Sequence, residues 1–387
     1  MRFLAEEKEA QSNIFNILDD KKRELIARGE DVINLSVGTP DFQPDRHVME
    51  AVQTAAQDPQ NFKYSLGDLP ELTEAVLHWY DRRYGVSLER NEVTSVNGSQ
   101  EGIAHIAFPV CQKGDIVLCP DPGYPIFSFG PQIAGAHIGL LPLTEENHYL
   151  IDFEKIPSSI AHRTKAMVVS YPSNPLTAMA DEAFYERLVY FAKQYDILVI
   201  HDNAYSELVF DGKKGGSFLE IPGAKEIGVE FNSLSKSYNY TGARASFALG
   251  RQDVIAKFKA FRSQIDYGMF LPVQYGAIAA LTGPQDIVVR NREGYEKRRN
   301  VLCGGFRKIG WNVPNSQATM FVWAKVPEKF ADAPTFVLEL MEKTGVICVP
   351  GDSFGELGKG YVRFALVEPE VRLLEAVNRI EQSGILK

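Results

Sequence analysis

The chain has little cysteine and no long apolar run. Four cysteines in 387 residues are too few and too scattered for a disulfide scaffold or a cysteine-based metal cluster. Nowhere do about 18 consecutive apolar residues occur, so no transmembrane helix is predicted. The first ten residues turn acidic before an apolar segment of a secretory signal could form. We therefore expect buried structural thiols, no metal site, no membrane partner and a cytoplasmic location. The cysteines are Cys111, Cys119, Cys303 and Cys348.

The chain also lacks an excess of positive charge. Its formal net charge is -9 and its pI is about 5.4, whereas a nucleic-acid surface needs clustered lysine and arginine. Internal repeats, low-complexity runs and long linkers are absent as well. The charge balance therefore predicts no nucleic-acid partner. Because 387 residues exceed what one hydrophobic core usually fills, we also expect two domains.

Short apolar runs alternate with longer periodic segments from residue 91 onward. Buried strands of a parallel sheet read as continuous apolar runs, so this alternation predicts an α/β fold with a mainly parallel sheet. Helical spacing near residues 11–28 predicts an amphipathic N-terminal helix. After about Pro272, helices and two strand-like runs predict a smaller α+β lobe. The runs read as parallel strands are 92–96, 115–119, 166–170, 197–200 and 228–231.

Each of these five runs ends in a polar or glycine- and proline-rich turn. In open α/β sheets a ligand binds outside the carboxyl ends of the strands, so the five turns are expected to surround one site. They span residues 97–102, 120–125, 171–175, 201–205 and 233–236.

Three of these turns contain residues suited to a Schiff-base cofactor that carries an anion. Lys236 lies among hydroxyl residues, as a reactive amine requires, and Arg244 follows nearby. Asp202 ends a strand three residues before Tyr205, and a carboxylate there would keep a pyridine-type nitrogen protonated. The turn at Gly98 opens a helix after a strand, which offers free amides to a phosphate.

The ordered set of these residues resembles the fold-type I, class I/II pyridoxal-phosphate aminotransferases over almost the whole chain, closest to the bacterial LL-diaminopimelate/aspartate branch. The resemblance implies an aspartate-aminotransferase-like fold: an N-terminal helix and arm at 1–45, a large cofactor-binding domain at 46–275 and a small domain at 276–387. It also implies transfer of an amino group from an L-amino acid to a 2-oxo acid, 2-oxoglutarate in the family. The matching residues are Asn174, Asp202, Tyr205, Ser233, Lys236, Arg244 and Arg363.

The resemblance assigns the chemistry to four residues. Lys236 resembles the lysine that forms the Schiff base and then moves a proton between the substrate Cα and the cofactor. Asp202 resembles the partner of the pyridine nitrogen. Asn174 and Tyr205 resemble the pair that donates hydrogen bonds to the phenolic oxygen of the cofactor and so lowers the pKa of the Schiff base.

Further cofactor contacts are implied by the same resemblance. Ser233 and Arg244, with the backbone amides of Ser99 and Gln100, resemble the phosphate-binding residues. Tyr124 occupies the position of the aromatic residue that stacks on the cofactor ring.

Four residues are expected to act on the substrate or across subunits. Arg363 resembles the arginine that binds the substrate α-carboxylate in a bidentate fork, helped by the backbone of Gly38; Asn174 is also placed beside the substrate. Tyr64 resembles the tyrosine that reaches the phosphate of the neighbouring subunit. The resemblance thus implies a homodimer with composite active sites, with the N-terminal helix packed on the partner.

The substrate stays open at this stage. Where the family commonly has Thr-Gly after Asn-Pro, this chain has Leu176-Thr177-Ala178, and Ala243 replaces a common tryptophan beside the phosphate arginine. A dicarboxylate would need a second cation, and the sequence does not place Lys63, Arg262 or Lys325 there. LL-diaminopimelate, aspartate, alanine and aromatic amino acids are all compatible.

Two other functions compete with transamination. A cystathionine-type C–S β-lyase uses the same fold and lysine, and a single sequence separates the two poorly. A pyridoxal-phosphate-binding transcription regulator would need a winged-helix domain, for which the roughly thirty residues before Asn34 are expected to be too few.

Overall fold

The described residues form two compact units. The computed structural model describes residues 12–387, so the first eleven residues of the predicted N-terminal arm lie outside the described part. The larger unit comprises residues 39–296 and 317–319, and the smaller one comprises the described residues up to Gly38 with 297–316 and 320–387. The domain limits expected from the sequence stay a prediction.

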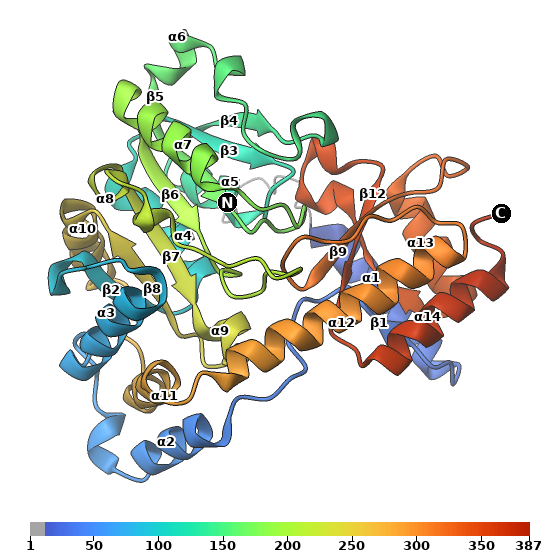
Figure 1. Ribbon diagram of the computed structural model, residues 1–387, viewed down its shortest axis with the longest axis horizontal. Coiled ribbons are helices and arrows are strands. Elements are labelled where there is room, and N and C mark those ends of the chain that lie inside the picture. Colours follow the sequence, from blue (N-terminus) through green and yellow to red (C-terminus); the bar gives the residue numbers. More distant parts are fainter. Residues whose placement is uncertain (1–11) are drawn as a thin grey trace, which may run out of the picture. The chain divides into compact units, whose positions relative to one another are not determined.

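A seven-stranded sheet forms the centre of the larger unit (Figure 1). Its strands are β2 (Val93–Val96), β3 (Ile116–Asp121), β4 (His137–Pro142), β5 (Thr164–Ser170), β6 (Leu198–Asp202), β7 (Gly228–Ser233) and β8 (Ser246–Gly250). They lie in the order β2-β8-β7-β6-β5-β3-β4. Only β8 runs against its neighbours, so the predicted mainly parallel sheet is confirmed. All five polar turns follow parallel strands and therefore lie at the same edge of the sheet.

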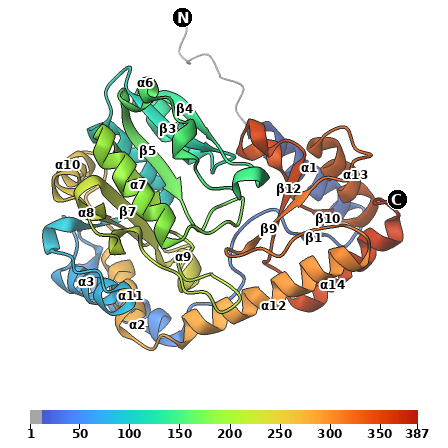
Figure 2. The same cartoon turned by 45° about the horizontal axis from the view of Figure 1, so that its top comes forward.

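Helices cover both faces of this sheet. α4, α5 and α10 pack on one face, where Ile103, Phe127 and Phe258 enclose strand residues such as Val168. α7 covers the other face in both views (Figures 1 and 2), and the Tyr185 hydroxyl lies 3.1 Å from Nε2 of His201 on β6. The helices of this unit are α2 (Arg46–Ala56), α3 (Pro70–Tyr84), α4 (Ser99–Val110), α5 (Ile126–Ile133), α6 (Ser158–Ala161), α7 (Glu182–Tyr195), α8 (Ala224–Ile227), α9 (Leu234–Ser237), α10 (Gln252–Arg262) and α11 (Leu271–Thr282).

The smaller unit combines an antiparallel sheet with helices, as the sequence predicts for the C-terminal lobe. Its strands are β1 (Ile33–Asn34), β9 (Phe321–Lys325), β10 (Val346–Ile347), β11 (Val349–Pro350) and β12 (Tyr361–Ala365), and its helices are α1 (Ser12–Ala27), α13 (Ala333–Thr344) and α14 (Glu370–Ser383). β12 lies between β11 and β9, and β1 pairs with β10. α12 (Asp286–Lys308) begins in the larger unit and ends in this one. None of the described helices is both long and apolar enough to cross a bilayer.

Candidate functional site

Asp202 ends the central strand of the predicted site. Its backbone pairs with Ser170 of β5 on one side and with Phe231 of β7 on the other. The side chain is only 8% exposed, and its Oδ1 has no hydrogen-bond partner among the described residues. Burial raises the pKa of the carboxyl to about 6, although His201 and the backbone N–H of Ala204 act in the opposite direction. A buried carboxylate oxygen without a donor is unfavourable, so this position suits a cationic N–H group.

Lys236 follows the neighbouring strand. It lies on α9, directly after β7, and is half-buried. The Ser233 hydroxyl caps α9 by accepting a hydrogen bond from the backbone N–H of Ser235, 3.2 Å away, and lies 2.8 Å from Ser246 Oγ. This cap orients the short helix that presents the lysine at the edge where Asp202 ends β6.

Asn174 and Tyr205 complete the edge. Asn174 follows β5 and is 9% exposed, and Tyr205 follows β6 and is 6% exposed. Since β5, β6 and β7 are adjacent and parallel, their turns bring these two residues, Asp202 and Lys236 to one edge of the sheet. The structure therefore gathers these four residues as the sequence predicts.

A candidate anion-binding position lies at the start of α4. It consists of Gly98, the backbone N–H groups of Ser99 and Gln100, and Arg244, and is called the anion seat or phosphate seat below. Gly98 caps this helix with φ 95, and a Cβ added there would lie 2.7 Å from Cζ of Arg244. The guanidinium therefore lies directly against the glycine, where a side chain would displace it. The first N–H groups of a helix have no intrahelical acceptor, and here they belong to Ser99 and Gln100. Gln100 Oε1 accepts a hydrogen bond of 2.9 Å from the Tyr124 hydroxyl, which brings Tyr124 to the same seat.

These residues fit the cofactor that the sequence resemblance implies. The buried Oδ1 of Asp202 suits a protonated ring nitrogen, and Lys236 supplies an amine on α9, directly after the neighbouring strand. The start of α4, with Arg244 beside it, combines backbone N–H groups with a cation, as a phosphate dianion requires. In the described part of the chain, by contrast, no group of three histidine, cysteine or carboxylate side chains is arranged to hold a metal ion.

Tyr64 lies apart from these contacts. Its side chain is 81% exposed, and its ring meets the Tyr267 ring edge-on at 5.2 Å. The role expected for Tyr64 requires a second copy of the chain.

Arg363 and Gly38 meet the same aromatic ring in the smaller unit. Arg363 is 6% exposed, and its Cζ lies 4.1 Å from the ring centroid of Phe321 and 4.6 Å from that of Phe354. Its Nη2 donates a hydrogen bond of 3.0 Å to the Ser36 carbonyl. A Cβ at Gly38 would lie 2.7 Å from Cε1 of Phe321. The two predicted substrate residues are thus neighbours, and aromatic faces orient the guanidinium.

The sequence reasoning did not identify a group of polar residues behind Gly98. The Asn97 side chain donates a hydrogen bond of 2.8 Å to Asp266, and Asp266 forms an ion pair of 2.9 Å with Arg262. Arg262 is buried. No local motif could have shown this group, because Asn97 and Asp266 are 169 residues apart.

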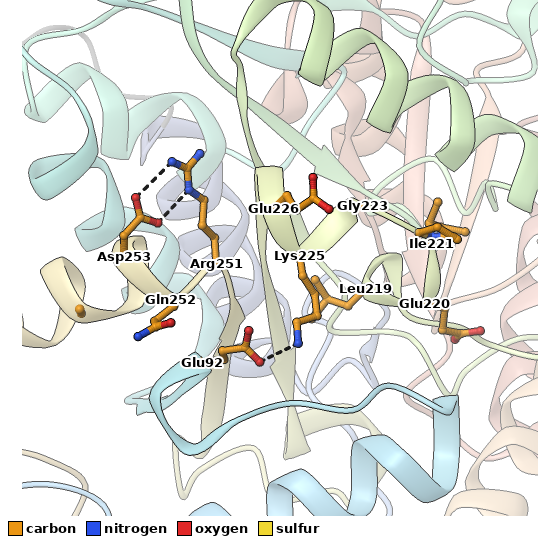
Figure 3. A pocket seen from close by; sticks show the side chains of 12 residues that line it. Glu92, Leu219, Glu220, Ile221, Gly223, Lys225, Glu226, Arg251, Gln252 and Asp253 are labelled. Carbon is orange, nitrogen blue, oxygen red and sulfur yellow. Dashed lines mark hydrogen bonds and ion pairs between the residues drawn. The ribbon is translucent and has the colours of Figure 1, made fainter.

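A cavity of about 750 Å³ lies elsewhere in the larger unit (Figure 3). Its lining residues precede β2 and β7 or follow the antiparallel β8, so it lies at the sheet edge opposite Asp202. Two of its cations are paired: Lys225 with Glu92 at 2.8 Å and Arg251 with Asp253 at 2.8 Å. Because these pairs neutralise their own charge, the cavity offers no counterpart of the seat at Gly98.

Comparisons with known proteins give the same result as the geometry. The family described as "Aminotransferase class I and II" matches residues 30–380. An LL-diaminopimelate aminotransferase of Moorella thermoacetica is 44% identical over 371 residues, which cover 95% of both chains. Among solved structures, substrate-bound BacF of Bacillus subtilis is 35% identical with a TM-score of 0.94, covering 99% of this chain and 98% of that one.

The fold comparison extends to an aspartate aminotransferase. A single mutant of the Thermus thermophilus enzyme is 26% identical with a TM-score of 0.92, covering 99% of this chain and 100% of that one. The aspartate-aminotransferase-like architecture is therefore confirmed. The named relatives do not favour the C–S β-lyase alternative. The chain belongs to the class I and II aminotransferases and is a pyridoxal-phosphate-dependent transaminase of the LL-diaminopimelate aminotransferase branch.

Proposed function

We propose that the protein transfers an amino group from LL-diaminopimelate to a 2-oxo acid, 2-oxoglutarate, in a site centred on Asp202 and Lys236. The buried and unpartnered Oδ1 of Asp202, beside the strand that leads to Lys236, is the observation that carries the proposed site. The substrate is supported by the name of the relative that is 44% identical along almost the full length of both chains.

Four residues at the sheet edge carry the chemistry. Bound pyridoxal phosphate supplies an electron-withdrawing pyridinium ring, and Asp202 holds the proton on its nitrogen. Lys236 Nζ would hold the cofactor covalently and, as a free amine, would be the base that takes the proton from the substrate Cα. Asn174 and Tyr205 donate hydrogen bonds to the phenolic oxygen.

The phosphate and the substrate carboxylate are held by other residues. The phosphate would be held by Ser99, Gln100, Ser233 and Arg244, and Tyr124 would pack against the cofactor ring. In the smaller unit, Arg363 and the Gly38 backbone bind the α-carboxylate. The faces of Phe321 and Phe354 keep the planar guanidinium in the orientation that a bidentate fork requires.

The functional unit is a homodimer in which Tyr64 completes the phosphate site of the partner. Residues 62–66 and 265–270 support this proposal because they expose large apolar side chains, an unusual feature for a surface that faces water. Tyr64 and Tyr267 lie within this surface, and so do Phe62 and Phe270, whose rings meet at 5.3 Å. The N-terminal helix on the partner subunit and the cytoplasmic location stay predictions.

A panel of amino donors tests the function. With 2-oxoglutarate as acceptor, LL-diaminopimelate should give glutamate with a kcat/KM at least about 100-fold above those of aspartate, alanine and phenylalanine, because unmatched polar groups in a binding site reject analogues strongly. Lys236→Ala should lose turnover by several orders of magnitude. If another amino acid is the preferred donor, the proposed substrate is wrong. Pyruvate and ammonia released from cystathionine without any oxo acid would instead favour the lyase.

Asp202 should make the stability of the cofactor-free protein depend on pH. The pKa of Asp202 is about 6 in the folded chain, against a reference value of 3.8. Its favourable contribution to the free energy of unfolding is therefore complete below about pH 4, where the carboxyl is protonated in both states, and is lost as pH rises through 6. At about pH 8, cofactor-free Asp202→Asn should be more stable than wild type by up to about 3 kcal/mol. Urea unfolding at several pH values measures this difference. An equal difference at pH 4 and pH 8 would contradict the role of burial.

Mixing Lys236→Ala with Tyr64→Phe, provided that the second variant is itself impaired, tests the composite site. In a hybrid dimer of Lys236→Ala and Tyr64→Phe, one site carries both defects and the other carries none. Re-associated equal mixtures should therefore regain activity, with about a quarter of all sites intact. Each variant re-associated alone serves as the control. If Tyr64 acts in its own chain, no hybrid contains an intact site and mixing yields no gain.

A further inference from the structure

Asn97, directly before Gly98, is held by two carboxylates that share Arg262. The Asn97 side chain donates a hydrogen bond of 2.8 Å to Asp266 Oδ2, and its backbone N–H donates one of 3.0 Å to Glu101 Oε2. Arg262 Nη2 contacts both carboxylate oxygens of Asp266, at 2.9 and 3.1 Å, and Arg262 Nε lies 3.7 Å from Glu101. Arg262 also donates to the Ser95 carbonyl. The chain is thus restrained on both sides of Val96, directly before Gly98.

These contacts affect Gly98 because the backbone conformation of this glycine is restricted. Gly98 adopts φ 95, a conformation that few residues other than glycine accept. A Cβ at Gly98 would displace the Arg244 guanidinium, so the two groups lie in contact. A small rotation at Asn97 would therefore move the first N–H groups of α4 relative to the guanidinium.

The contacts are also largely shielded from water. Arg262 is 6% exposed and Ser95 is 1% exposed, and the side chains of Glu101 and Asp266 are mostly buried. An ion pair in such surroundings is rigid, and losing one partner leaves the other charge poorly compensated. A surface pair would not restrain a loop in this way.

We propose that Asp266, held by Arg262, is a positioning residue for the phosphate of the cofactor: it fixes Asn97 and thereby the spacing between the start of α4 and Arg244. Asp266 acts through Asn97 and Gly98. This inference rests on the phosphate seat proposed above.

Paired affinities for pyridoxal phosphate and pyridoxal test the inference. Both ligands react with the same lysine, but only the first carries a phosphate. Asp266→Ala should raise the Kd for pyridoxal phosphate by about tenfold or more, since it removes a hydrogen bond to a charged group. The Kd for pyridoxal should change less than about twofold. Asp266→Asn, which can still accept from Asn97 but loses the charge that pairs with Arg262, should lie between wild type and Asp266→Ala.

The chain offers a matched control. Arg251 and Asp253 flank the start of α10 and form a similar two-pronged ion pair, at 2.8 and 3.1 Å, but at the surface and at the opposite sheet edge. Asp253→Ala should leave both affinities unchanged. If Asp266→Ala weakens both ligands equally, or neither, Asp266 does not position the phosphate seat.

Two further variants separate the possible failures. Arg244→Ala touches the proposed seat itself, so an unchanged ratio of the two affinities in that variant would overturn the seat and not merely Asp266. Should Asp266→Ala fail to fold, Asn97→Ser breaks the same hydrogen bond while the Arg262–Asp266 ion pair remains. It should then raise the Kd for pyridoxal phosphate selectively, and an unchanged ratio in Asn97→Ser would refute the inference.

Discussion

The buried carboxylate of Asp202 is the constraint around which the larger unit is organised. It ends β6, which lies between β5 and β7 in the sheet, and burial raises its pKa to about 6. The charged form of a carboxylate at this depth is destabilised unless a cation or several donors lie beside it. Its unpartnered oxygen therefore favours one kind of ligand, a ring whose nitrogen can be protonated, and the two neighbouring strands bring Asn174 and Lys236 to the same edge.

The phosphate seat, at the same sheet edge, is suited to bind a dianion rather than a cation. A phosphate dianion needs several donors that do not move, and the first turn of α4 with Arg244 provides them. Because Arg244 contacts Gly98, the distance between its guanidinium and the first turn of α4 depends on the backbone of Asn97. Burying Arg262 between Asp266 and Glu101 is a means of holding that backbone.

Local patterns sufficed for much of the fold and for the residues at the strand ends. Continuous apolar runs followed by polar turns identified β2, β3, β5, β6 and β7, and the turns contain Asn174, Asp202 and Lys236. The strands β4 and β8 were not predicted. β4 lies at the sheet edge, and its short apolar run contains a glycine and is bounded by His137 and Pro142. β8 has the apolar character of its neighbours, but nothing in its own residues signals that it runs antiparallel.

Contacts between distant parts of the chain could not be predicted in this way. Asp266 is 169 residues from Asn97, and each alone is typical of a solvated loop. Phe321 appears in the sequence as one more apolar strand residue, yet its ring meets both Gly38 and Arg363. Which charges pair, and which glycines lack space for a Cβ, depend on the three-dimensional packing rather than on the spacing of residues.

The protonation state of the cofactor ring tests the central claim most directly. The protein reconstituted with pyridoxal phosphate labelled with ¹⁵N in the ring can be followed by ¹⁵N NMR. We predict a protonated ring nitrogen in wild type from about pH 6 to about pH 9, because the buried Asp202 carboxylate stabilises the cation. In Asp202→Asn we predict a neutral ring nitrogen. A neutral nitrogen in wild type, or the same chemical shift in both proteins, would contradict the claim.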